Sequence, residues 1–370
     1  MKTKNWYTIQ DIDQLDSPAL VIYPERVKEN IQRAISMAGD AGRLRPHIKT
    51  NKSPDTTKLM LAAGITKFKC ATIAEAEMLG QCQAPDVLLA YQPGGPKLQR
   101  FAQVVGKYPG TKYSCLVDNI GAAKKIAGHF TLMGKTIPVY IDLNVGQNRT
   151  GIIPGEKAME LFRFCTNTRG ISFKGLHAYD GHIRNRNYEE RKKVCDEAFA
   201  LVENMKKEIE AAGFSPIIIA GGSPSFSVHC KRPNVECSPG TFVFWDKTYL
   251  DLCPEQPFEP AALLVTRVIS LPDATRICLD LGHKSVAAEN EITRRVFFPE
   301  APDLQPLSQS EEHLVLEAGP GHRYQPGDVL YGIPHHICPT VALYERAYTI
   351  ENGQLSGEWR ITARDRQLTI

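Results

Sequence analysis

Short apolar runs alternate with longer amphipathic stretches through the first two thirds of the chain. Helical periodicity follows several of these runs, for example over 72–80 and 188–212. Eight runs have the length and composition of strands: 44–49, 66–71, 87–91, 112–117, 137–143, 172–179, 216–220 and 235–238. This alternation predicts an α/β fold whose parallel strands close into a (β/α)8 TIM-type barrel rather than an open doubly wound sheet.

The pattern changes near residue 250. Helical periodicity mostly disappears, and Pro-, Gly- and Asp-rich turns separate short strand-like segments: 262–271, 276–281, 313–317, 327–331 and 341–348. This texture predicts a second, mainly antiparallel β domain. We therefore expect the barrel over 20–249 and the β domain over 1–19 together with 250–370. The strand-like segment 19–23 either packs near the β domain or begins the barrel.

Composition and charge narrow the class of protein. Apolar and aromatic residues make up 42% and charged residues 23%, which is ordinary for a folded globular chain and excludes a disordered one. The net charge of +3, without a long basic run, argues against nucleic acid as a partner. No apolar stretch is long enough to span a membrane, and the start lacks the apolar core of a signal peptide. Ten cysteines without paired spacing are typical of reduced thiols, so we expect a cytoplasmic protein.

Candidate chemistry is expected where strands end, because functional groups of such barrels lie at the carboxyl ends of the strands. The first strand runs into Lys49, an amine that forms a Schiff base if its surroundings favour the neutral form. Lys52, three residues on, competes by composition alone. After the fifth strand, Arg149 could hold a phenolate or carboxylate, or form a structural ion pair with Asp142.

The loop after the seventh strand contains Gly221-Gly222-Ser223. Consecutive small residues let backbone N–H groups close around an anion, and the hydroxyls of Ser223 and Ser225 are additional donors. The loops after the seventh and eighth strands are the usual phosphate site of this barrel. The position therefore predicts a phosphate-binding loop, although the same residues also make a plain tight turn.

Taken together, these motifs resemble the alanine-racemase-type (fold type III) pyridoxal-phosphate enzymes. The likeness is closer to the D-threonine aldolase / D-serine dehydratase family, through Arg45-Pro-His-Ile-Lys-Thr-Asn-Lys52 and Pro334-His-His-Ile-Cys-Pro-Thr-Val341. Other motifs of that family follow in the right order, so the resemblance covers nearly the whole chain. It implies pyridoxal 5′-phosphate (PLP), a divalent metal and a small D-amino-acid substrate. The implied cofactor-binding residues are His47, Lys49, Arg149, Tyr179, Gly222 and Ser223, and the implied metal ligands are His336 and Cys338.

Residue chemistry supports the metal pair independently. Residues at i and i+2 of an extended segment point the same way, and imidazole with thiolate suits zinc. A single His-x-Cys is also the pattern of a buried cysteine beside a solvated histidine.

Two departures from the aldolase pattern affect the predicted reaction. Aldolases of this family carry a histidine base a few residues after the Tyr-x-Gly segment, where this chain has Asn185; His182 or His177 could replace it. Aldolases usually have His-x-Asp at the metal, whereas this chain has His-x-Cys, as in the dehydratases. We therefore expect dehydration of small D-β-hydroxy amino acids such as D-serine or D-threonine, with Lys49, Tyr179 and His182 as the catalytic side chains.

Three other functions stay open. A D-threonine aldolase, which splits its substrate into glycine and an aldehyde, is the main alternative. An amino-acid racemase normally needs a second base and no metal, and a non-enzymatic PLP carrier is usually a lone barrel. The resemblance also implies a homodimer in which the β domain of one subunit helps to close the barrel mouth of the other.

Overall fold

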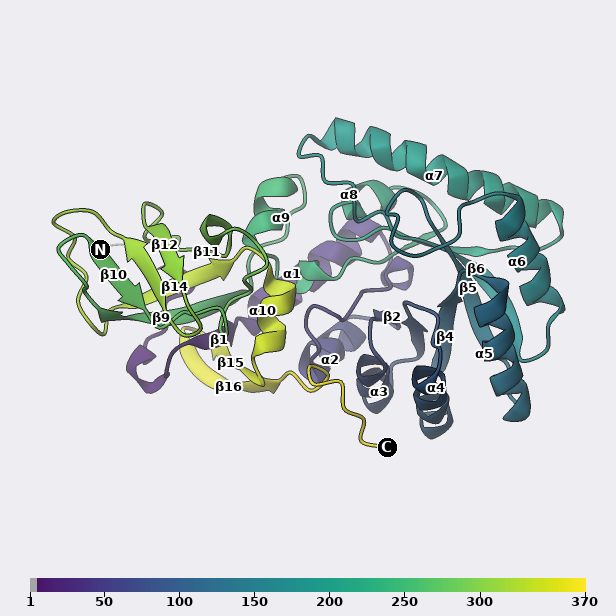
Figure 1. Ribbon diagram of the computed structural model, residues 1–370, viewed down its shortest axis with the longest axis horizontal. Helices are drawn as coiled ribbons and strands as arrows, with labels where there is room; N and C mark the ends of the chain where they lie inside the picture. The colour runs from purple at the N-terminus through teal and green to yellow at the C-terminus, as the bar shows by residue number, and fades with distance from the viewer. Residues whose placement is uncertain (1–4) are drawn as a thin grey trace.

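The computed structural model describes residues 5–370, which form a barrel of alternating strands and helices beside a separate sheet (Figure 1). Seven barrel strands pair in parallel and in chain order. They are β2 (Lys67–Cys70), β3 (Asp86–Leu89), β4 (Lys112–Val117), β5 (Ile137–Leu143), β6 (Ile171–Ala178), β7 (Ile217–Ala220) and β8 (Val235–Cys237). These strands follow the predicted ones closely.

The segment 44–49 closes the barrel between its two edge strands. Leu44 bridges Cys237 of β8, and His47 bridges Lys69 of β2, both in parallel. The expected first strand is thus in place, but only as isolated bridges. Pro46 has no N–H to donate, which limits regular pairing at this position. The predicted α/β barrel with a second, mainly antiparallel β domain is confirmed.

Helices cover the outside of the barrel strands (Figure 1). They are α1 (Pro24–Ala38), α2 (Pro54–Ala62), α3 (Ile73–Gln81), α4 (Pro96–Lys107), α5 (Ile120–Leu132), α6 (Glu156–Asn167), α7 (Tyr188–Ala211) and the short α8 (Phe226–His229). Local sequence starts them: the side chains of Thr72, Asn119 and Asn187 each accept a hydrogen bond from an N–H of the first turn. The helical patterns predicted over 72–80 and 188–212 are confirmed.

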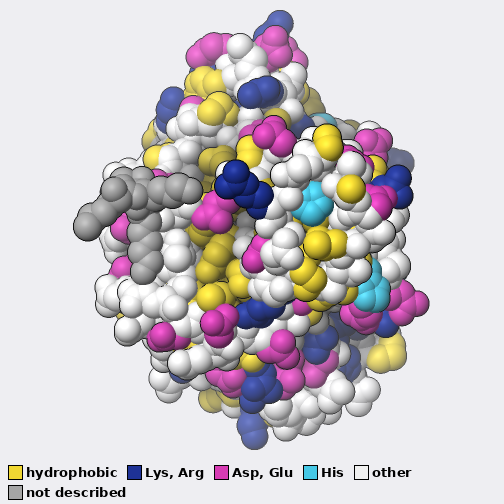
Figure 2. Space-filling view, turned by 90° about the vertical axis from the view of Figure 1, so that its left-hand side faces the viewer, with side chains coloured by type: hydrophobic (Ala, Val, Ile, Leu, Met, Phe, Trp, Pro, Cys, Tyr) yellow, Lys and Arg dark blue, Asp and Glu magenta, His cyan; other side chains and the backbone are white. Residues whose placement is uncertain are grey.

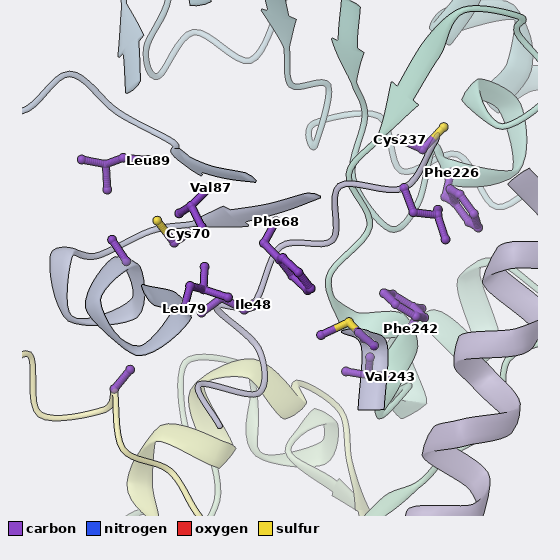
Figure 3. Packing of buried hydrophobic residues seen from close by; sticks show 14 of the residues in the cluster. Ile48, Phe68, Cys70, Leu79, Val87, Leu89, Phe226, Cys237, Phe242 and Val243 are labelled. Atoms are coloured by element: carbon purple, nitrogen blue, oxygen red, sulfur yellow. The ribbon is translucent and has the colours of Figure 1, made fainter. Parts of the chain in front are cut away.

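Alternate strand residues face two different cores. Outward-facing residues pack against the helices, as the cluster of Phe68, Cys70, Leu79 and Val87 shows (Figure 3). Each large apolar side chain buried in this way contributes about 1.5–3 kcal/mol. Inward-facing residues fill the barrel lumen, where Leu88, Leu116, Tyr140 and Ile219 form a small apolar cluster.

The second unit is a nine-stranded sheet in which only β1 and β15 pair in parallel. Its strands are β1 (Ala19–Ile22), β9 (Ala262–Ser270), β10 (Arg276–Leu279), β11 (Val296–Phe297), β12 (Gln305–Gln309), β13 (Leu314–Glu317), β14 (Val329–Pro334), β15 (Arg346–Glu351) and β16 (Gln354–Arg360). β1 pairs with β9 and β15, so the segment 19–23 belongs to this sheet and does not begin the barrel. The exact residue limits of the two domains stay a prediction.

The strand predicted over 341–348 is wrong in its first part. A helix, α10 (Ile337–Leu343), covers residues 341–343, and the strand β15 starts at Arg346, within the predicted segment. Pro339 lies in the first turn of α10, where its fixed φ suits a helix and its missing N–H costs nothing. Thr340 also donates its hydroxyl to the carbonyl of His336, at 2.8 Å. α10 lies between the sheet and the barrel (Figure 1).

The end of the molecule formed by the nine-stranded sheet carries basic and acidic side chains side by side (Figure 2). Across residues 5–370, no helix is both long and apolar enough to cross a membrane.

Candidate active site

Lys49 lies in a turn that directly follows the bridge closing the barrel. The residue is half-buried, and its backbone N–H donates to Nδ1 of His47 at 3.3 Å. Lys52, the competing lysine, takes a left-handed backbone conformation (φ 49°), and its ammonium forms an ion pair with the buried carboxylate of Glu75. The geometry therefore favours Lys49 as the amine presented at the barrel mouth.

His47, which precedes this turn, carries a neutral ring. Burial, together with the charge of Lys49, lowers its pKa well below the ordinary value for histidine. A neutral imidazole there can accept the N–H of Lys49 and still face a flat ring stacked above it.

Arg149 and Tyr179 lie together on neighbouring barrel loops. The guanidinium carbon of Arg149 is 5.0 Å from the centre of the Tyr179 ring, within the range of a cation–π contact. Asp142 forms no ion pair with Arg149; it accepts instead from Nδ1 of His177, at 2.7 Å. Arg149 is exposed, so its guanidinium can meet an anionic oxygen at the mouth.

The loop after β7 carries Gly222 and Ser223, both buried. A Cβ on Gly222 would lie 2.8 Å from Cε2 of Tyr179, so only glycine lets the tyrosine ring pack there. The hydroxyl oxygen of Ser223 accepts from the backbone N–H groups of Gly240 (3.4 Å) and Thr241 (3.1 Å), which follow β8. Two consecutive backbone donors of the loop after β8 thus meet a hydroxyl of the loop after β7. Backbone N–H groups and a hydroxyl gathered in this way are the groups that bind an anion such as phosphate.

Ser225 carries the other hydroxyl that was expected to face the anion, but this hydroxyl is bonded within the protein and holds the loop in place. It accepts from the Gly222 N–H at 3.2 Å and donates to Asp180 at 2.6 Å. Asp180 also accepts from Nε2 of His229 at 2.7 Å and from Cys195 at 3.8 Å. Asp180, Cys195 and His229 have ligand atoms within 4.8 Å of one another, a spacing that could hold a metal ion. Cys195 and His229 are both hydrogen-bonded to Asp180, so the three side chains already have partners. Their arrangement better fits a structural role in holding the loop after β7.

His336 and Cys338 lie at the start of α10. His336 is the N-cap and Cys338 is in the first turn, so they do not share an extended segment as predicted. The helical turn still brings them together. The pKa of His336 is raised to about 9, and the pKa of Cys338 is lowered. Burial alone would shift each pKa the other way, but the hydrogen bond and the electrostatic attraction between the two side chains outweigh it. The imidazole and the thiol of this pair are the two kinds of protein ligand that zinc prefers, and each binds a metal in its deprotonated form.

Two contacts bring this pair to the barrel mouth. The Sγ of Cys338 lies 3.0 Å from Oγ1 of Thr50, the residue after Lys49, and 3.6 Å from Oγ1 of Thr241. Nδ1 of His336 is hydrogen-bonded to Glu289. A carboxylate on that nitrogen is the usual device for orienting a metal-binding imidazole through its other nitrogen.

The two histidines that could replace the missing aldolase base lie in different surroundings. His177 is tied to Asp142, and its pKa is lowered by burial and by Lys69. His182 is exposed, and its Nε2 lies 2.8 Å from where a Cβ on Gly146 would be. Asn185 contributes its backbone carbonyl to Arg191, at 2.6 Å.

Sequence patterns did not indicate Glu289 or Lys69. The loop that contains Gly240 and Thr241 was expected at the phosphate site, because it directly follows the last predicted barrel strand.

Comparison with known proteins identifies the family. Residues 22–247 match the model described as "Alanine racemase, N-terminal domain", which is more than half of the chain. The chain belongs to the alanine racemase N-terminal domain family. Residues 261–350 match a second model, described as "Putative serine dehydratase domain". The family resemblance predicted from the sequence motifs is therefore confirmed.

Individual relatives match almost end to end. A D-threonine aldolase from Arthrobacter sp is 28% identical over 95% of this chain and 93% of the relative. The crystal structure of a D-threonine aldolase from Filomicrobium marinum superposes with a TM-score of 0.88 at 25% identity, covering all of both chains.

A third relative is the D-threo-3-hydroxyaspartate dehydratase of Delftia sp. HT23, whose structure has a TM-score of 0.81 at 22% identity over 94% of this chain and 97% of that one. Two variants of this dehydratase have also been solved. One lacks a histidine and the other a cysteine two residues further on, each replaced by alanine, and the cysteine variant is in the metal-free form.

Proposed function

We propose that this protein is a PLP- and metal-dependent lyase acting on small D-β-hydroxy amino acids, and that it cleaves the Cα–Cβ bond as a D-threonine-type aldolase. The observation that carries the proposal is the contact of Cys338 with Thr50 and Thr241. It brings the thiol of Cys338 and the imidazole of His336 to the same mouth as Lys49 and the anion-binding loops. A racemase or a PLP carrier has no use for such a pair.

The residues present suit PLP. Ser223 with the N–H groups of Gly240 and Thr241 would hold its phosphate, and Lys49 would carry its aldehyde carbon. Arg149 would face its phenolic oxygen. His47 and Tyr179 would lie against the cofactor's ring. Tyr179 can take this position because Gly222 has no side chain to displace it. When bound, PLP supplies the electron sink for bonds broken at Cα.

The donor set at α10 suits a divalent metal, and zinc best. Thiolate and imidazole are borderline-soft ligands, and two protein ligands leave positions open for substrate oxygens. The metal-free cysteine variant of the Delftia dehydratase supports the assignment, because the replaced pair there has the spacing of His336 and Cys338. A metal there would act as a Lewis acid toward the substrate β-oxygen.

The chain's own side chains then divide the remaining work. Lys49 is placed to accept or return a proton at Cα. His182, exposed at the mouth over Gly146, is our candidate for taking the proton of the β-hydroxyl. A positioned base of this kind contributes about 10²–10⁴-fold.

The sequence favoured dehydration, and the relatives change that preference. The D-threonine aldolases match nearly the full length, and one shares the whole fold at a TM-score of 0.88. Dehydration remains a second candidate because of one observation: His336 and Cys338 have the same spacing as the residues replaced in the dehydratase variants.

Product analysis tests the proposal. We expect D-threonine with zinc to give glycine and acetaldehyde, and L-threonine to give neither. Accumulation of 2-oxobutanoate and ammonia would establish dehydration instead. Turnover that is unchanged after chelator treatment and dialysis would overturn the metal's role, and racemised threonine without cleavage would overturn the lyase altogether.

Three further expectations accompany this proposal. We propose a homodimer, which light scattering would contradict by giving the mass of a single chain. We also propose a cytoplasmic location and a barrel domain that ends near residue 249. The expected start at residue 20 moves past β1, whose residues pair with the nine-stranded sheet.

A further inference from the structure

Lys69 of β2 is a buried lysine that belongs to none of the sequence motifs. Only 2% of its surface is exposed. Its neighbours Phe68 and Cys70 pack into the core outside the strand (Figure 3). Because side chains alternate along a strand, Lys69 points into the barrel lumen.

A hydrogen-bonded chain holds the Lys69 amine in place. Its Nζ donates to Nε2 of His177 at 3.2 Å, and Nδ1 of His177 donates to Asp142 at 2.7 Å. His177 is on β6, which does not neighbour β2 in the sheet, so the lysine reaches across the lumen. The chain ends in a carboxylate whose pKa stays below its usual value: the hydrogen bond from His177 outweighs the effect of burial. This anion balances a positive charge on Lys69.

The backbone of Lys69 is bonded to the segment that carries Lys49. Its N–H donates to the carbonyl of Pro46 at 2.8 Å, and its carbonyl accepts from the N–H of Ile48 at 2.9 Å. The amines of Lys49 and Lys69 therefore both lie in the same part of the barrel. Burial and the charge of Lys49 lower the pKa of Lys69 to about 7. The titratable and charged groups around Lys69 are Arg45, His47, Lys49, Asp142, His177, Tyr179 and Asp180.

We propose that Lys69, held by His177 and Asp142, is a positioning residue that places a second positive charge beside Lys49 and weakens proton binding at the lysine–PLP bond. The inference rests on the proposed role of Lys49 as the PLP lysine. Two like charges in a water-poor lumen repel, so a proton on one disfavours a proton on the other. The lysine–PLP bond then loses its proton at a lower pH than it would beside a neutral residue.

A pH titration of the visible absorption of the holoenzyme tests this. In Lys69→Gln the charge is lost, but the amide N–H can still donate to His177. We expect its titration midpoint to lie higher than that of the wild type, by on the order of one pH unit. Lys69→Arg keeps the charge and should keep the midpoint near that of the wild type.

Lys67→Gln is the matched control. Lys67 is two residues earlier on β2, and its ammonium is already paired with Glu236, so the midpoint should not move. Thermal unfolding of each variant separates a loss of stability from a shift of the midpoint. Lys69→Met removes the same charge and replaces Lys69→Gln if the amide prevents folding.

The outcomes separate the two proposals. A wild-type protein that binds PLP without a visible lysine-bound band would overturn the proposed function together with the role of Lys49. A wild type with that band, but with the same midpoint in Lys69→Gln and Lys69→Met, would overturn only the inference about Lys69. A midpoint raised in Lys69→Arg as much as in Lys69→Gln would also overturn it, because the charge would then not be the cause.

Discussion

The Sγ of Cys338 lies 3.0 Å from the Oγ1 of Thr50. These residues are 288 positions apart in the chain. One starts a helix beside the nine-stranded sheet, and the other follows the lysine at the barrel mouth. Their contact means that residues of both the barrel and the second unit form the barrel mouth. A substitution in one unit should therefore affect binding at residues of the other.

Replacing Cys338 should release the metal. Thiolate ligands favour zinc, whereas carboxylates favour harder ions such as Mn²⁺ and Mg²⁺. We expect Cys338→Ser to weaken zinc retention by at least about 10–100-fold, the loss that even removal of an outer partner of a ligand brings. Cys338→Asp should recover more activity with Mn²⁺ than with Zn²⁺. The measurement is metal content per chain after dialysis against a chelator.

Cys82→Ser is the control for that experiment, since Cys82 is a free, half-buried thiol outside the mouth. Equal zinc in Cys338→Ser and Cys82→Ser would show that the metal lies elsewhere, with Asp180, Cys195 and His229 as the next candidates.

Borohydride reduction of the PLP-loaded protein should attach the cofactor to Lys49. Peptide mapping identifies the modified residue. Lys49→Ala should lose this adduct and at least about 10²–10⁴-fold in turnover, because it also lacks the group that returns a proton to Cα after the Cα–Cβ bond breaks. Modification of Lys52 or Lys69 in the wild type would contradict the assignment. The ion pair of Lys52 with Glu75 gives a physical reason to expect none there.

Most of the fold could be predicted because its pattern is local. Apolar runs followed by helical periodicity identify the barrel strands whatever their partners. The prediction failed over 341–343, where the β-branched Val341 follows the β-branched Thr340, but tertiary contacts and Pro339 favour a helix. Single-chain patterns weigh residue types alone, so the anchoring of α10 to Asp246, which accepts from the Ile337 N–H at 3.2 Å, was invisible.

The site was predictable where its residues lie in compact motifs, as Lys49, Gly222 and His336 do. Lys69 was not, because its role depends on reaching across the lumen to His177. In the sequence alone, a lysine between two buried residues on a short strand does not indicate a role in the site. Its partner becomes apparent only when β2 and β6 face each other in the closed barrel. The loop of Thr241 was expected at the phosphate site, but the hydrogen bond of its N–H to Ser223 forms only once two loops are side by side.

Glycine at 222 should be essential for cofactor binding. A methyl group there would lie 2.8 Å from the Tyr179 ring and displace it. Such overpacking typically costs about 1–3 kcal/mol, so Gly222→Ala should bind PLP about 5- to 150-fold more weakly. The measurement is the dissociation constant from a spectroscopic titration of apoprotein with PLP. Gly110→Ala, where a Cβ meets nothing within 4 Å, is the control. Equal affinities would remove Tyr179 from the cofactor site.

The support beneath the phosphate loop should make stability depend on acid pH. Asp180 is buried, which alone would raise its pKa, but the charge and hydrogen bond of His229 hold that pKa below the usual value. A carboxyl with a depressed folded-state pKa stabilises the fold above its unfolded pKa, and the stability is lost as pH falls through the folded one. Asp180→Asn should therefore lower the free energy of unfolding by about 3–5 kcal/mol at neutral pH, as expected for one partner removed from a buried pair. Its deficit relative to the wild type should shrink as the solution is acidified below pH about 4.

Urea unfolding at a series of pH values measures this, and Asp196→Asn, at a more exposed carboxylate paired with Lys192, is the control. A deficit that is the same at every pH would mean that Asp180 acts through packing and not through its charge.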